Sequence, residues 1–82
     1  QQALLAPASG MWVGSPDVKF DTMLSKGTEL GKVYNVYGNV TGTVQAPQDG
    51  VVFGLRSRAS VLEGEWCCFF GIVERTVDNL LP

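Results

Sequence analysis

Two adjacent cysteines, Cys67 and Cys68, are the only cysteines in this 82-residue sequence. Adjacent cysteines rarely form a disulfide with each other, because that bond needs their Cα atoms further apart and their Cβ vectors converging. No C-x-x-C spacing or further ligand accompanies them, so the sequence predicts reduced, structural thiols. Because neighbouring residues of a strand point to opposite faces, we expect one thiol to be buried and the other to point outward.

Histidine is absent from the whole chain. Zinc hydrolases, Ser-His-Asp hydrolases and Cys-His enzymes all need at least one imidazole, so this chain alone builds none of those sites. The carboxylates of Asp17, Asp21, Glu29 and Asp49 form no convincing pair and have no calcium-loop spacing. We therefore predict that the chain has no catalytic, cofactor-binding or metal-binding residue.

Four other side chains are candidates for contact with a substrate or with another domain: Arg56, Arg58, Tyr34 and Tyr37. The two arginines point to the same side if the preceding strand continues through Ser57. Their guanidiniums could then attract a carboxylate substrate or form an interdomain ion pair; two solvated loop arginines are the alternative. The tyrosines lie in a polar and aromatic hairpin, which is either a contact surface or simply a turn.

The composition restricts the class of protein and its partners. Hydrophobic residues make up 45% of the chain and charged residues 17%, which is typical of one small globular domain. A net charge of −2 argues against nucleic acid as a partner. The longest apolar run, Trp66–Phe70, is far shorter than the ~20 residues of a membrane span. With reduced cysteines and no signal peptide, these features predict a cytoplasmic protein.

Short valine-rich runs between ten glycines and four prolines predict an all-β chain. No window keeps a helical apolar stripe, and the segment 17–26 is expected to be a loop with at most one turn. The expected strands are Gln2–Ala6, Gly10–Gly14, Glu29–Tyr34, Asn39–Ala46, Gly50–Leu55 and Glu65–Glu74. The last one is apolar on both faces, so we expect it to be covered on both sides. Residues 75–82 are expected to be a loosely packed tail.

One turn motif occurs twice in the chain. The segments "APASGMWVG" (6–14) and "APQDGVVFG" (46–54) share Ala-Pro and two glycines, and "LSKGTELGKV" (24–33) parallels "VLEGEWCCFF" (61–70). Neither half buries its apolar face alone. The repeat therefore predicts a barrel-sandwich hybrid of two quasi-equivalent strand–turn–strand repeats over residues 1–74. Gly10 and Gly50 are expected to have positive φ, and Pro7 and Pro47 to mark strand ends.

The tandem turn pattern resembles the biotinyl/lipoyl-type domains. In the carrier members of that group, a lysine at a hairpin tip holds the prosthetic group. The corresponding hairpin here is "VYNVYGNV" (33–40), which has Tyr37 or Gly38 at that place, and no lysine follows Lys32. A swinging-arm carrier is excluded, because no amine is available for acylation.

A second resemblance covers residues 6–74. The chain is similar to the C-terminal domain of the succinylglutamate desuccinylase/aspartoacylase family of zinc-dependent deacylases. The matching residues are Gly27, Leu30-Gly31, Val33-Tyr34, Gly38, Ala46-Pro47, Asp49-Gly50-Val51-Val52, Arg56, Val61, Gly64 and Glu65.

This resemblance implies a parent enzyme that hydrolyses the amide of N-acyl amino acids or similar small amines. It places zinc and its ligands in a preceding N-terminal hydrolase domain of the same chain, and no cofactor in this segment. The implied role is non-catalytic: the barrel limits which small N-acylated substrates reach the active site. The start at Gln1 favours a fragment of a longer protein. The alternative is a stand-alone hybrid-motif interaction module without enzymatic role.

Overall fold

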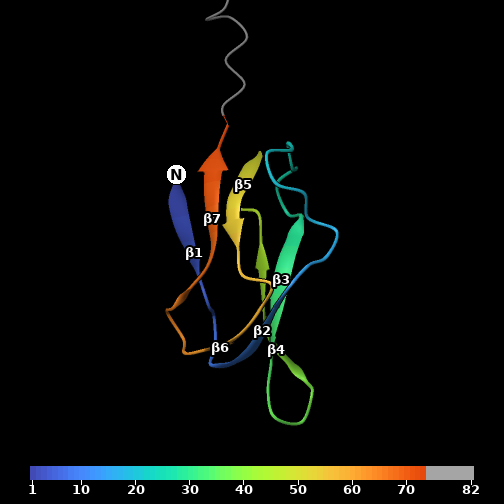
Figure 1. Ribbon diagram of the computed structural model, residues 1–82, viewed down its shortest axis with the longest axis vertical. Coiled ribbons are helices and arrows are strands. Elements are labelled where there is room, and N and C mark those ends of the chain that lie inside the picture. Colours follow the sequence, from blue (N-terminus) through green and yellow to red (C-terminus); the bar gives the residue numbers. More distant parts are fainter. Residues whose placement is uncertain (74–82) are drawn as a thin grey trace, which may run out of the picture.

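Residues 1–73, the part of the chain that the computed structural model describes, form an all-β domain without a helix in that range (Figure 1). Its seven strands are β1 (Gln2–Leu5), β2 (Gly10–Gly14), β3 (Glu29–Tyr34), β4 (Val40–Gln45), β5 (Gly50–Leu55), β6 (Arg58–Val61) and β7 (Trp66–Ile72). They form two antiparallel sheets, with the strand orders β1-β7-β5 and β4-β3-β2-β6. The expected all-β fold is confirmed. The expected tail, 75–82, lies outside the described residues.

Strand β6 is missing from the strands predicted from sequence. Only Ala59 and Val61 of its four residues pack toward the core, and polar side chains occupy the positions between them. Such a short segment carries too little apolar alternation to be recognised. The segment 17–26, predicted as a loop, contains one bridge residue, Leu24, which pairs with Gly50.

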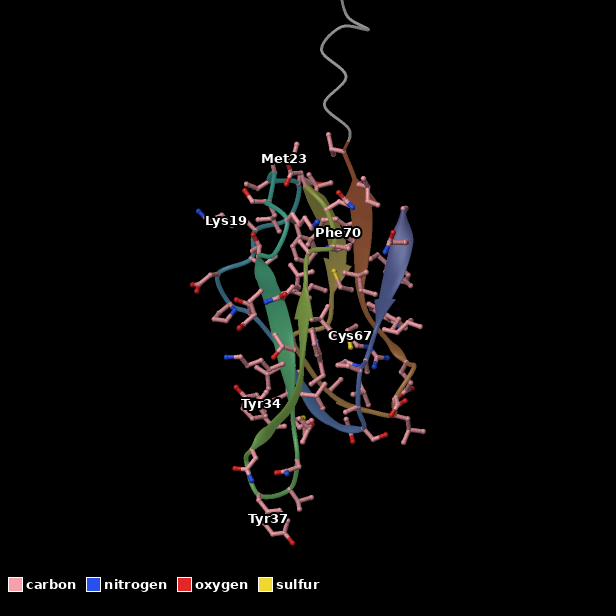
Figure 2. The ribbon with its side chains drawn as sticks, turned by 180° about the vertical axis from the view of Figure 1, so that it is seen from behind. Lys19, Met23, Tyr34, Tyr37, Cys67 and Phe70 are labelled. Carbon is pink, nitrogen blue, oxygen red and sulfur yellow. The ribbon has the colours of Figure 1, made fainter. Side chains whose placement is uncertain are left out.

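The core lies between the two sheets. Its largest fully buried side chains are Trp12, Phe70, Leu30, Val33, Val52, Cys67 and Cys68. Trp12 on β2 also donates a 2.8 Å hydrogen bond from its indole nitrogen to the carbonyl of Arg56, which satisfies its one polar group. Figure 2 shows Cys67 and Phe70 on β7, within the body of the domain rather than at its ends.

The two halves of the chain repeat the same arrangement, as the repeat predicts. In one sheet β2 pairs with β3 and β6; in the other, β5 pairs with β7 and, through a single bridge, with Leu24. The strand pair β3–β4 likewise corresponds to β7–β1. The four-stranded sheet and the three-stranded sheet therefore have the same arrangement once the two halves of the chain are exchanged. The barrel-sandwich of two quasi-equivalent repeats is confirmed.

The Ala-Pro turn of each half is bonded to the charged-Gly turn of the other half. Gly27 donates its N–H to the carbonyl of Ala46 at 2.8 Å, and Gly64 donates to Ala6 at 2.9 Å. Both glycines have positive φ, 91° and 92°, which favours glycine at these positions. The turn motif is repeated because each copy closes the opposite half of the sandwich.

Side chains reinforce both turn contacts in the same way. The carboxylate of Asp49 accepts a 2.8 Å hydrogen bond from the N–H of Lys26. In the other half, the hydroxyl of Ser9 accepts a 2.9 Å hydrogen bond from the N–H of Glu63. Each acceptor stands immediately before the glycine of its Ala-Pro turn, so Asp49 has a structural role that the sequence motif alone does not reveal.

A β-bulge explains why the prediction for the cysteines was wrong. Trp66 pairs with Leu5 and Cys68 with Leu4, so Cys67 is an extra residue in β7 without a partner in β1. A bulge interrupts the alternation of side chains along a strand. Both thiols are consequently fully buried in the core, instead of one being buried and one pointing outward.

The same bulge occurs at the equivalent place in the first half. Glu29 pairs with Gln45 and Gly31 with Val44, which leaves Leu30 as the extra residue of β3. Leu30 is fully buried, as Cys67 is. The expected coverage of both faces of β7 is confirmed in part: Cys67, Cys68, Phe70 and Gly71 are buried and Trp66 and Phe69 are half-buried, but Ile72 at the end of the strand remains exposed.

The two turn glycines have different reasons to be glycine. Gly10 has a φ of 150°, as expected, but Gly50 is not among the positive-φ residues of the described chain, so that part of the prediction was wrong. A Cβ at Gly50 would instead collide with the carbonyl oxygen of Gly71 and lie 2.7 Å from the ring of Phe70. Close strand approach, rather than an unusual φ, requires glycine at this position.

Candidate functional site

The β3–β4 hairpin ends in a tight, ordered tip at one end of the molecule (Figure 2). The side chain of Asn35 accepts hydrogen bonds from the N–H groups of Tyr37 (2.9 Å) and Asn39 (3.0 Å). The N–H of Gly38, with a φ of 82°, bonds to the carbonyl of Asn35. This Asx-type network holds the tip while leaving Val36 94% and Tyr37 84% exposed.

A groove runs from this tip along the outer face of the four-stranded sheet. We call it the hairpin groove; it is lined by Met11, Val13, Tyr34, Asn35, Val36, Gly38 and Arg58. Its volume is about 390 Å³, and an adjoining hollow extends it past Gly10 and Ser60. Residues from β2, β3 and β6 meet here because these strands are neighbours in the sheet.

Arg58 enters the hairpin groove from the first position of β6. It is exposed and lies opposite Val13 in the β2–β6 ladder. Ser60, two residues further along β6, lies opposite Met11. Alternation along the strand therefore places Arg58 and Ser60 on the outer face, whereas Ala59 and Val61 pack inward.

Arg56 lies in a different environment. Its guanidinium carbon is 4.7 Å from the centre of the Trp66 ring, which is a cation–π distance. Trp66 in turn stacks on Phe69, with ring centres 4.6 Å apart. The N–H of Arg56 bonds to Cys67 of the three-stranded sheet, at 3.0 Å, whereas the carbonyl of Ser57 accepts from Gly14 of the other sheet, at 2.8 Å.

The chain therefore crosses from one sheet to the other between the two arginines. β5 ends at Leu55 and β6 begins at Arg58, so no single strand continues through Ser57. The condition under which the two guanidiniums would share a side is not met. Of the four residues proposed from sequence, Tyr34 and Arg58 both line the groove. Tyr37 lies on the tip beside it, and Arg56 packs on Trp66 of the other sheet.

Sequence reasoning missed the apolar lining of the groove, namely Met11, Val13 and Val36. One signal for the first two was available, because both alternate with the fully buried Trp12 and must face outward if Trp12 faces inward. For Val36, nothing in the sequence distinguished an exposed tip residue from a buried one.

Burial disfavours the thiolate form of both cysteines. It raises the pKa of Cys67, although the nearby Arg56 partly opposes the shift. Burial, together with the neighbouring Cys67 thiol, raises the pKa of Cys68 from 9.0 to about 11. Because the thiolate is the nucleophilic and metal-binding form, neither thiol is suited to catalysis at neutral pH.

Within residues 1–73, no three His, Cys, Asp or Glu side chains gather in a way that would hold a metal ion. No helix in that range is long and apolar enough to cross a membrane. What the groove offers chemically is one guanidinium, the polar groups of Tyr34 and Asn35, and apolar contact area.

No family model matches the sequence, and no curated protein matches it significantly.

Proposed function

We propose that this domain is a non-catalytic accessory domain of a zinc-dependent deacylase that hydrolyses N-acyl amino acids or similar amides. In this role it limits the access of small N-acylated substrates to the active site of a preceding domain of the same protein. The proposal includes a cytoplasmic location, because both cysteines are free and reduced thiols fit a cytoplasmic protein.

The resemblance to the C-terminal domain of the succinylglutamate desuccinylase/aspartoacylase family motivates the proposal. The observation that carries it is the position of the shared motif residues, since Gly27, Ala46, Asp49 and Gly64 form the bonds that close the two halves. A carrier role does not fit the hairpin, where Tyr37 and Gly38 stand in place of an acceptor lysine. The resemblance implies that the zinc ligands lie in a preceding domain, and the lack of histidine in this chain agrees with that implication.

The test uses the full-length natural protein that contains this segment. Metal analysis should find about one zinc per chain, and the protein should hydrolyse members of a panel of N-acyl amino acids. Deleting this domain should change KM or substrate preference more than zinc content. Absence of zinc and of hydrolysis in the full-length protein would overturn the proposal, as would stoichiometric zinc binding by the isolated 82-residue chain.

A protein-interaction module without an enzymatic role is the second candidate. The exposed tip at Val36 and Tyr37 favours it, because hydrogen bonds hold the tip backbone and aromatic residues are enriched at protein interfaces. The two candidates differ in the deacylase assay, not in the fold.

A further inference from the structure

We propose that the hairpin groove and the adjoining tip form a docking surface for a protein segment that presents an acidic side chain between apolar ones. The acidic side chain pairs with Arg58, and its apolar neighbours contact Met11, Val13 and Val36. This inference goes beyond the deacylase assignment and does not depend on it.

The charge of Arg58 determines the chemistry of the partner. The one ion pair among residues 1–73 joins Lys32 to Glu29, with 3.4 Å between the charged atoms. The guanidinium of Arg56 makes a cation–π contact with the ring of Trp66. Arg58 has neither an ion pair nor a cation–π contact within that range, although it lines a largely apolar groove. An arginine in such a place is suited to a carboxylate, which accepts two parallel hydrogen bonds from the guanidinium.

The shape of the surface favours a protein segment over a small molecule. Small-molecule sites usually enclose most of their ligand. The hairpin groove is instead open along the outer face of the sheet and continues onto the tip, where Val36 and Tyr37 are almost fully exposed. Aromatic residues, Met and Arg are enriched in protein interfaces, and all three types meet here.

The position of the tip leaves it free for such a partner. It lies at the end of the molecule opposite the N-terminus and the end of β7 (Figure 1). The hydrogen bonds that the side chain of Asn35 accepts fix the backbone of the tip beforehand, so little conformational entropy is lost on binding.

The experiment is a ¹H–¹⁵N NMR titration of the intact chain with a capped probe peptide of alanine, leucine, glutamate, leucine and alanine. The amides of Gly10, Met11, Tyr34 and Asn35 should shift saturably. Replacing the glutamate of the peptide by glutamine, or making Arg58→Gln, should weaken binding at least about fivefold, because a charge-assisted hydrogen bond is lost. The matched control Arg56→Gln should stay within about twofold of the parent, since that arginine faces the other sheet.

Several outcomes would overturn the proposal. These are the absence of saturable shifts, equal binding of the glutamine peptide, and an equal loss in the Arg56→Gln variant. A thermal unfolding scan of each variant shows whether it is folded, so a loss of binding by a folded Arg58→Gln protein is informative. Equally tight binding of hexanoate alone would also overturn the assignment, because a small carboxylate would then suffice.

Discussion

The outer faces of the two sheets occupy equivalent places in the fold but carry different chemistry. Glu29 and Trp66 hold the same position before the repeated bulge. Three residues further along each strand, Lys32 corresponds to Phe69. In the first half, Glu29 and Lys32 form an exposed salt bridge. In the second half, Trp66 and Phe69 form an aromatic stack. The repeat therefore determines which positions of each strand face inward. The chemistry of the outward side chains differs between the two halves.

A second difference decides which face is open. Tyr34 of the first half corresponds to Gly71 of the second, and the ring of Phe53 lies against that glycine. Phe53 is an extra residue, because Val52 pairs with Phe70 and Gly54 with Phe69. On the outer face of the three-stranded sheet, aromatic rings therefore cover the surface. The guanidinium of Arg56 lies over one of these rings, that of Trp66. The outer face of the four-stranded sheet instead has the hairpin groove, which is lined by Arg58, and Arg58 has no such aromatic contact within residues 1–73.

The largest expected effect concerns what the halves share. Gly10→Val and Gly50→Val should each reduce the free energy of unfolding by roughly 3 kcal/mol, because a Cβ at either site collides with a backbone carbonyl of the neighbouring strand. Urea unfolding measures both. A loss below about 1 kcal/mol at one site only would mean that the two turns are not equivalent.

The next effect concerns the outward pair. Trp66→Ala should cost about 2–3 kcal/mol, because it removes the stack on Phe69 and the contact with Arg56. Glu29→Ala at the equivalent position should cost less than about 1 kcal/mol, since an exposed ion pair contributes little. Equal losses in chemical denaturation would remove the distinction between the two faces.

The thiol of Cys68, next to the bulge residue Cys67, should make the free energy of unfolding decrease at alkaline pH. Cys68 has a folded pKa of about 11 against an ordinary 9.0, so folding favours the protonated thiol. Its contribution is complete below about pH 9 and is lost as the pH rises toward about 11, a decrease of roughly 2 kcal/mol.

Comparing the parent with Cys68→Ala isolates the contribution of this thiol to the pH dependence. The free energy of unfolding should fall more steeply between about pH 9 and about pH 11 in the parent than in the variant. Parallel curves would show that the thiol does not carry the dependence. Gly31 occupies the equivalent position in the first half and cannot titrate.

The smallest effects should again be equal in the two halves. Asp49→Ala and Ser9→Ala each remove one side-chain acceptor for a turn N–H, and each should cost about 1 kcal/mol. Thermal unfolding of the two single variants tests this. A cost at Asp49 alone would show that the carboxylate acts through its charge rather than as the counterpart of Ser9.

The sequence predicted the repeat, and hence the fold, because the Ala-Pro turns and their glycines are local features. It did not predict the bulges at Leu30 and Cys67, which arise from pairing with a distant strand. For the same reason, it left open whether Arg56 and Arg58 share a side: the crossing between sheets at Ser57 depends on hydrogen bonds with Gly14 and Cys67. Tyr34 was identified, but the groove beside it required the neighbouring strands.

The difference between the two arginines is the central claim, and one spectrum tests it. In a ¹H–¹⁵N spectrum of the arginine Nε–Hε groups, Arg56 should be displaced by the ring current of Trp66 and should remain unchanged during titration with the glutamate probe peptide. Arg58 should begin near the position of a free arginine and should shift as the peptide is added. An equal response of Arg56 and Arg58, or a response of Arg56 alone, would contradict this difference between the two arginines.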